Sequence, residues 1–111
     1  MIARHWRGCT RPEDADAYED LLSDQIMPSI RQVPGCHGGY LLRGESEPNE
    51  VEFVVIHVFE SLDALREFTG EDYAKAVIEP EARALLCRAD EAAVHYAIRV
   101  DTLQEPGTPD R

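Results

Sequence analysis

Histidine is the side chain in this sequence best suited to proton transfer near neutral pH, and the chain has four: His5, His37, His57 and His95. Each falls in a segment that reads as a β-strand. No two have the close spacing of metal ligands, and no acidic residue recurs with them in a pattern, so we expect no metal site. His57 stands in an otherwise apolar run, where an imidazole must find a hydrogen bond or stay neutral at a desolvation cost. It is therefore either a satisfied core residue or a catalytic one, and both interpretations also stay open for His95, beside Tyr96.

Three aromatic side chains could complete a site around such a group. Trp6, Phe68 and Tyr73 either fill the core or line a flat aromatic pocket, with core filling the simpler interpretation for Phe68. Trp6 shares its strand face with Arg4, so this pair is either a solvated edge or the polar end of a pocket. No G-x-S-x-G, H-E-x-x-H, Walker or dinucleotide motif occurs, and hydrolase, metalloprotease, NTPase and NAD chemistry have no support.

The segment that carries His57 is the element that the rest of the chain must cover. Residues 51–59 form a short β-branched and aromatic run, which predicts a strand. Both faces of that strand are apolar, whereas a strand with one wet face would alternate. The chain has enough helix to cover one face only. We therefore expect a second copy of the protein to cover the other, in a homodimer.

The remaining elements follow from turn signals and periodicity. Thr10 and Glu13 fit a capping box that begins the first helix, and Pro28 should kink or end that helix in its last turn. Gly38 and Gly39 predict a bulge or a close backbone approach in the second strand. The predicted elements are a strand over 2–7, a helix from 10, strands over 36–43 and 51–59, a helix from 61, helical pieces over 72–78 and 80–86, and a strand over 92–100. This order predicts an α+β, ferredoxin-like βαββαβ fold, with a four-stranded antiparallel sheet and both helices on one face.

Length and composition set the broad class. The 111 residues fit one domain over 1–100, followed by an aperiodic tail over 101–111. A formal net charge of −11 repels phosphate backbones and anionic membranes, so we expect no nucleic-acid or membrane partner. No apolar run is long enough to span a bilayer and no signal-peptide pattern is present, which favours the cytoplasm. Cys9, Cys36 and Cys87 are widely spaced and odd in number, as expected of reduced thiols.

Four stretches of this chain resemble the antibiotic biosynthesis monooxygenase domain, a dimeric α/β barrel. They are residues 2–8, residues 51–68, the Gly-Glu-Asp-Tyr at 70–73 and the His-Tyr at 95–96, and the resemblance covers about residues 1–100. It implies a cofactor-independent monooxygenase that acts on an aromatic or polyketide-derived small molecule. A base, His57 or His95, would remove a proton from an acidic phenol or methylene, and the resulting anion would reduce oxygen. Trp6, Tyr73 or Tyr96 would hold the developing oxyanion or the substrate carbonyl.

Haem-degrading relatives of this family carry an asparagine on the first strand and a haem-ligating histidine in the helix after the third strand. Here Trp6 occupies the first-strand position, and Val77 and Ile78 stand where the ligand is expected. The resemblance therefore implies no haem, and we expect no bound cofactor of any kind. The alternative function is a non-catalytic dimeric module that binds a small hydrophobic metabolite.

Overall fold

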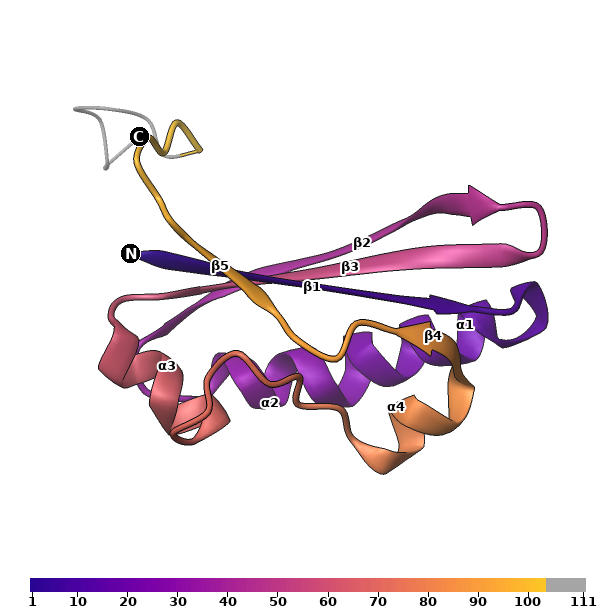
Figure 1. The fold of residues 1–111 in the computed structure, drawn as a ribbon, viewed down its shortest axis with the longest axis horizontal. Helices are drawn as coiled ribbons and strands as arrows, with labels where there is room; N and C mark the ends of the chain where they lie inside the picture. Colours follow the sequence, from indigo (N-terminus) through magenta and orange to yellow (C-terminus); the bar gives the residue numbers. More distant parts are fainter. Residues whose placement is uncertain (104–111) are drawn as a thin grey trace.

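The computed structural model describes residues 1–103, apart from the side chains of Ser46 and Glu47. The elements are β1 (Ile2–Thr10), α1 (Pro12–Leu21), the π-helical turn η1 (Leu22–Ile26), α2 (Met27–Arg31), β2 (Cys36–Glu47), β3 (Glu50–Phe59), α3 (Leu62–Thr69), α4 (Pro80–Leu85), β4 (Leu86–Ala89) and β5 (Val94–Ala97). The antiparallel sheet has the order β2-β3-β1, and β4 and β5 both pair with the free edge of β1. Figure 1 shows the helices together on one side of this sheet. The predicted ferredoxin-like α+β fold is confirmed.

β3 lies inside the sheet, as its sequence predicts, and its two faces have different surroundings. Phe53, His57 and Phe59 point toward the helices and are buried. The alternate residues, Val54, Ile56 and Val58, point to the face that no helix covers, and they are only partly buried. Tyr40 and Leu42 of β2 lie directly beside them on this face. Val94 and Tyr96 of β5 lie on the same face one strand further away, across β1. The open face of the sheet therefore carries an apolar patch, beside the ion pair of Arg7 and Glu52.

The helical layer is built on one long interrupted helix. α1, η1 and α2 continue without a break, so Pro28 does not end the helix. The wider π turn immediately before Pro28 accommodates the missing N–H and the bulk of the ring. Tyr18 and Leu22 of this helix are buried against Phe53, and the Tyr18 and Phe53 rings meet edge to face at 4.8 Å between centroids. This contact anchors the helix across the sheet.

The start of that helix differs from the capping-box prediction. Thr10 is the last residue of β1, where it pairs with Val51 on one side and Leu86 on the other. The N-cap is Arg11, which makes no side-chain cap bond, and Pro12 occupies the first helical turn. Because the backbone of Thr10 is engaged in the sheet, its hydroxyl is not positioned to cap the helix.

Two predicted elements near the C-terminal end are also corrected. Residues 72–78 are not helical but belong to an irregular segment over 70–79, which we call the strap. Two backbone hydrogen bonds join it to the segment beside the sheet edge: Ala76 N–H donates to the Glu91 carbonyl, and Ala93 N–H donates to the Ala74 carbonyl. The last strand predicted over 92–100 is shorter in the structure, as β5. β4 was not predicted as a strand; it precedes β5 across an irregular step at residues 90–93 and gives the sheet five strands instead of four. The strap lies against this irregular step.

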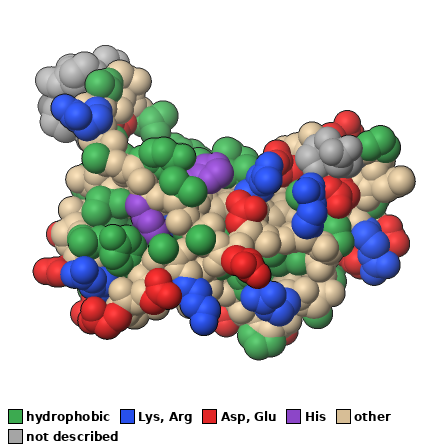
Figure 2. All heavy atoms as spheres, viewed as in Figure 1, with side chains coloured by type: hydrophobic (Ala, Val, Ile, Leu, Met, Phe, Trp, Pro, Cys, Tyr) green, Lys and Arg blue, Asp and Glu red, His purple; other side chains and the backbone are tan. Residues whose placement is uncertain are grey.

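Two further expectations concern the ends and surface of the chain. Over the described residues, no helix is long and apolar enough to cross a membrane. The predicted tail over 101–111 lies outside the described residues from position 104 onward. In Figure 2, charged side chains follow the helical side of the molecule and its right-hand end, while hydrophobic side chains gather near the end of the sheet that holds the N-terminus.

Candidate functional site

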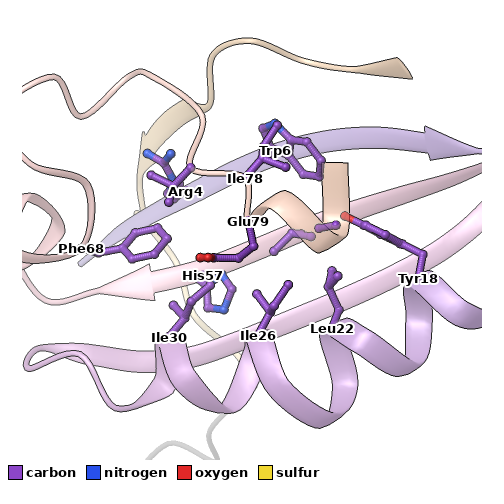
Figure 3. A pocket seen from close by; sticks show the side chains of 13 residues that line it. Arg4, Trp6, Tyr18, Leu22, Ile26, Ile30, His57, Phe68, Ile78 and Glu79 are labelled. Atoms are coloured by element: carbon purple, nitrogen blue, oxygen red, sulfur yellow. The ribbon is translucent and has the colours of Figure 1, made fainter. Parts of the chain in front are cut away.

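A small cavity lies between the covered face of the sheet and the helical layer (Figure 3). Its volume is about 60 Å³. The lining residues are Arg4, Trp6, Tyr18, Leu22, Ile26, Ile30, Val55, His57, Phe68, Val77, Ile78, Glu79 and Ala82. The wall is mostly apolar and aromatic, with a few polar tips, which is typical of a small-molecule site.

Arg4, His57 and His95 form one row across the sheet. Arg4 of β1 stands directly opposite His57 of β3 on one side and opposite His95 of β5 on the other. Directly paired residues point to the same face, so all three side chains face the helical layer. The antiparallel register therefore brings together groups that lie far apart in the sequence.

The Arg4 guanidinium is buried, with only 6% of the residue exposed. Nη1 donates to the Tyr73 carbonyl oxygen at 2.6 Å, and Nη2 donates to the Lys75 carbonyl oxygen at 3.0 Å. Nη1 also lies 2.9 Å from Nε2 of His95. Desolvation lowers the pKa of Arg4 to about 10, so the side chain stays charged at neutral pH. Arg4 thus ties the strap to the sheet while presenting a buried positive charge.

The tautomer of His95 follows from this contact. A guanidinium has only donors, so Nε2 of His95 must accept the hydrogen bond and its ring proton must lie on Nδ1. Desolvation, followed by the charge of Arg4, lowers the pKa of His95. His95 does not line the cavity, and its Nε2 lone pair is already engaged.

His57 differs from His95 in both its position and its hydrogen bonding. It is only 3% exposed, it lines the cavity, and its Nε2 has no hydrogen-bond partner among the described residues. Desolvation, with a smaller effect from the charge of Arg4, lowers its pKa to about 4. At neutral pH this residue is an uncharged imidazole whose buried Nε2 is available to a ligand.

The other three predicted site residues have different positions. Trp6 presents its ring to the cavity, but its indole N–H donates to the Asp90 carbonyl oxygen at 2.7 Å. Tyr73 contributes its carbonyl to Arg4 and packs its ring edge against His95 at 5.3 Å between centroids, outside the cavity lining. Tyr96 is 56% exposed, and its register partner Ala3 assigns it to the open face.

Three residues with polar groups line the cavity but were not predicted as site residues: Arg4, Tyr18 and Glu79. The sequence signal for Arg4 was its shared strand face with Trp6, and the pocket-end interpretation of that pair is the one that the structure bears out. Tyr18 lies one helical turn before Leu22, a spacing that indicates a core residue, and its burial raises its pKa. Glu79 gave no signal, because it precedes α4 in the strap and reaches the cavity only through the tertiary fold.

An outer groove adjoins the cavity. It has a volume of about 250 Å³ and shares Ile26, Ile30, Phe68 and Glu79 with the cavity lining. Glu79 is exposed and lines both spaces. Together they approach the roughly 300 Å³ at which small-molecule sites begin, whereas the inner cavity alone is too small for a haem. In the part of the chain that the structure describes, no three His, Cys, Asp or Glu side chains gather to hold a metal ion.

The fold is a ferredoxin-like α+β domain with a small, mostly apolar cavity between its sheet and its helices. The sequence model of the antibiotic biosynthesis monooxygenase family matches residues 1–80, and the chain belongs to this family. No curated protein sequence matches the chain.

Several solved structures share the fold at low sequence identity. A protein from Deinococcus radiodurans assigned to the antibiotic biosynthesis monooxygenases is 19% identical, with 91% of this chain and 95% of that chain covered and a TM-score of 0.63. SnoaB, a cofactor-independent oxygenase from Streptomyces nogalater, is 16% identical over 90% and 94%, with a TM-score of 0.61. A haem-degrading protein from Mycobacterium tuberculosis, solved with two haems in its active site, is 15% identical over 91% and 98%, with a TM-score of 0.59. These similarities establish the fold and leave the chemistry open.

Proposed function

We propose that this protein is a cofactor-independent monooxygenase that oxidises an aromatic or polyketide-derived small molecule, and that it works as a homodimer. The observation that carries the proposal is the buried Nε2 of His57, a ring nitrogen without a partner among the described residues, in the wall of an apolar cavity. Membership of the family and the fold shared with SnoaB support the reaction class.

In the proposed reaction, the substrate enters through the outer groove past Glu79 and its ring lies between Phe68 and the helix residues Ile26 and Ile30. Nε2 of His57 accepts a proton from an acidic phenol or methylene carbon, and the electron pair stays on the substrate. The substrate anion then reduces molecular oxygen. One oxygen atom remains on carbon as a new carbonyl, and the other leaves as water, so a methylene is converted into a ketone.

His57 is a better candidate for the base than His95. The Nε2 lone pair of His95 already accepts a hydrogen bond from Arg4, and protonation there would break that bond and place two positive charges side by side. The depressed pKa of His57 makes it a weak base, but it ensures that the imidazole is unprotonated throughout the neutral range. His95 and Tyr73 then hold Arg4 and the strap, while the Trp6 ring supplies apolar surface.

The test is oxygen uptake with a tricyclic anthrone in air, without added cofactor. We expect His57→Ala to lower kcat by roughly 10²- to 10⁴-fold, which is the usual effect of removing a general base. His37→Ala is the matched control, because His37 is exposed on β2 and contacts Glu60 instead of the cavity. Equal activity in His57→Ala and the wild type would exclude His57 as the base. Anthrone binding without turnover would favour the non-catalytic binding module.

A further inference from the structure

The positive charge of Arg4 has only neutral partners. Two backbone carbonyls and the imidazole of His95 accept its hydrogen bonds, and no carboxylate among the described residues lies within ion-pairing distance of it. A buried charge without a counter-ion is costly, and neutral acceptors offset only part of that cost. A ligand that carries a negative charge would offset the cost of burying Arg4.

The surroundings of Arg4 indicate what such a ligand looks like. The guanidinium lies over the Phe68 ring, 5.6 Å from its centroid, and both residues line the cavity. An aromatic ring held by the apolar wall would carry an oxygen substituent toward the row of Arg4 and His57. Figure 3 shows these side chains around the same space.

We propose that Arg4 is the counter-ion for a ligand oxyanion, so that the site selects acidic phenols and enols and binds them ionised. The choice of ligand chemistry rests on the proposed function. The phenol O–H bond breaks, the electron pair stays on oxygen beside Arg4, and the proton passes to Nε2 of His57 and from there to solvent. Glu79, the one acidic residue among those lining the cavity, stands at the mouth. It disfavours the entry of anions, so the ligand enters neutral and ionises inside.

The experiment uses 4-nitrophenol, whose anion is yellow, in a spectrophotometric pH titration with saturating wild-type protein. An opposite charge at close range typically lowers a pKa by about 1 to 3 units. We therefore expect the pKa of bound 4-nitrophenol to fall by at least about one unit, which corresponds to tenfold tighter binding of the anion than of the phenol. The neutral ether 4-nitroanisole, bound to the same site, reports apolar affinity alone.

Variants of Arg4 distinguish an effect of its charge from an effect on the fold. Arg4→Gln should abolish the shift and leave 4-nitroanisole binding within about twofold, while Arg4→Lys should keep part of the shift. Arg7→Gln is the matched control, because Arg7 belongs to the same strand but points to the other face and pairs with Glu52. It should keep the full shift. Thermal unfolding of each variant verifies that the fold persists.

The wild-type titration tests the proposed role of Arg4 even if Arg4→Gln does not fold. A wild-type protein that fails to bind 4-nitrophenol, or binds it with an unchanged or raised pKa, overturns the proposal, and so does an undiminished shift in folded Arg4→Gln. Oxygen uptake is measured separately. A lowered pKa without turnover supports the role of Arg4 and counts against the oxygenase, whereas turnover with no shift counts against Arg4 alone.

Discussion

At the scale of a single residue, the burial of His57 makes the stability of the fold depend on pH. The pKa of this residue falls from its usual 6.5 to about 4 in the folded protein. Between those values the unfolded chain binds more protons than the folded one, so acid favours unfolding. The contribution of His57 to the free energy of unfolding is fully present above about pH 6.5 and is lost as the pH falls toward 4. The full effect of this one group is about 3 kcal/mol.

Urea unfolding at pH 7.5 and at pH 4.5 measures this effect. We expect His57→Leu, which cannot titrate, to lose clearly less stability than the wild type over that interval. His37→Leu is the control, because its imidazole is exposed and folding does not desolvate it in the same way. If His57→Leu and the wild type lose the same free energy of unfolding, the buried imidazole is not neutral in the native state.

At the scale of an element, the predicted irregularity in β2 is confirmed, and a glycine explains it. The register between β2 and β3 shifts between Cys36 and Gly39, and a Cβ at Gly39 would overlap the carbonyl oxygen of Ile56. Gly39→Ala should therefore lower the free energy of unfolding by roughly 1–3 kcal/mol, the usual effect of overpacking. Chemical denaturation of both proteins provides the measurement.

Gly44 provides a matched comparison within the same strand. A Cβ at Gly44 would meet no heavy atom within 4 Å. Gly44→Ala should therefore stay within about 0.5 kcal/mol of the wild type. A Gly39→Ala protein as stable as Gly44→Ala would mean that the two strands do not approach so closely in solution.

At the scale of the whole molecule, the open sheet face is the basis for the proposed homodimer. Leu42 is 46% exposed in the single chain, so an aspartate there would be solvated and nearly harmless in a monomer. In a dimer that buries this face, Leu42→Asp should halve the mass measured by light scattering at micromolar concentration, because an unpaired buried charge costs several kcal/mol.

Ser23→Asp adds the same charge to an exposed position of the helical layer and should leave the mass of the assembly unchanged. A wild-type protein with the mass of one chain at micromolar concentration would contradict the dimer, as would a Leu42→Asp protein that remains dimeric. A monomeric wild type would mean that the open face is stable in water, and a dimeric Leu42→Asp protein would mean that the dimer does not bury Leu42.

The order of the elements and the central place of β3 could be predicted because they depend on local properties. β-branched residues at 51–59 favour a strand wherever it lies, and Ser61 caps α3 through a bond to the Ala64 N–H three residues away. The glycine bulge is also local. The helix predicted over 72–78 failed because the partners of its backbone groups are distant, at residues 91–93 and at Arg4.

The candidate site likewise has features that the local sequence predicts and others that depend on the tertiary fold. The sequence alone marked His57 as a buried polar group and left Arg4 as either a surface or a pocket residue. Only the antiparallel register brings Arg4 between His57 and His95, the latter 91 positions away, and only the strap delivers Glu79 to the cavity mouth. Local propensity and periodicity are properties of a few neighbouring residues. The charge, desolvation and partners of a site depend on which distant segments the folded chain packs together.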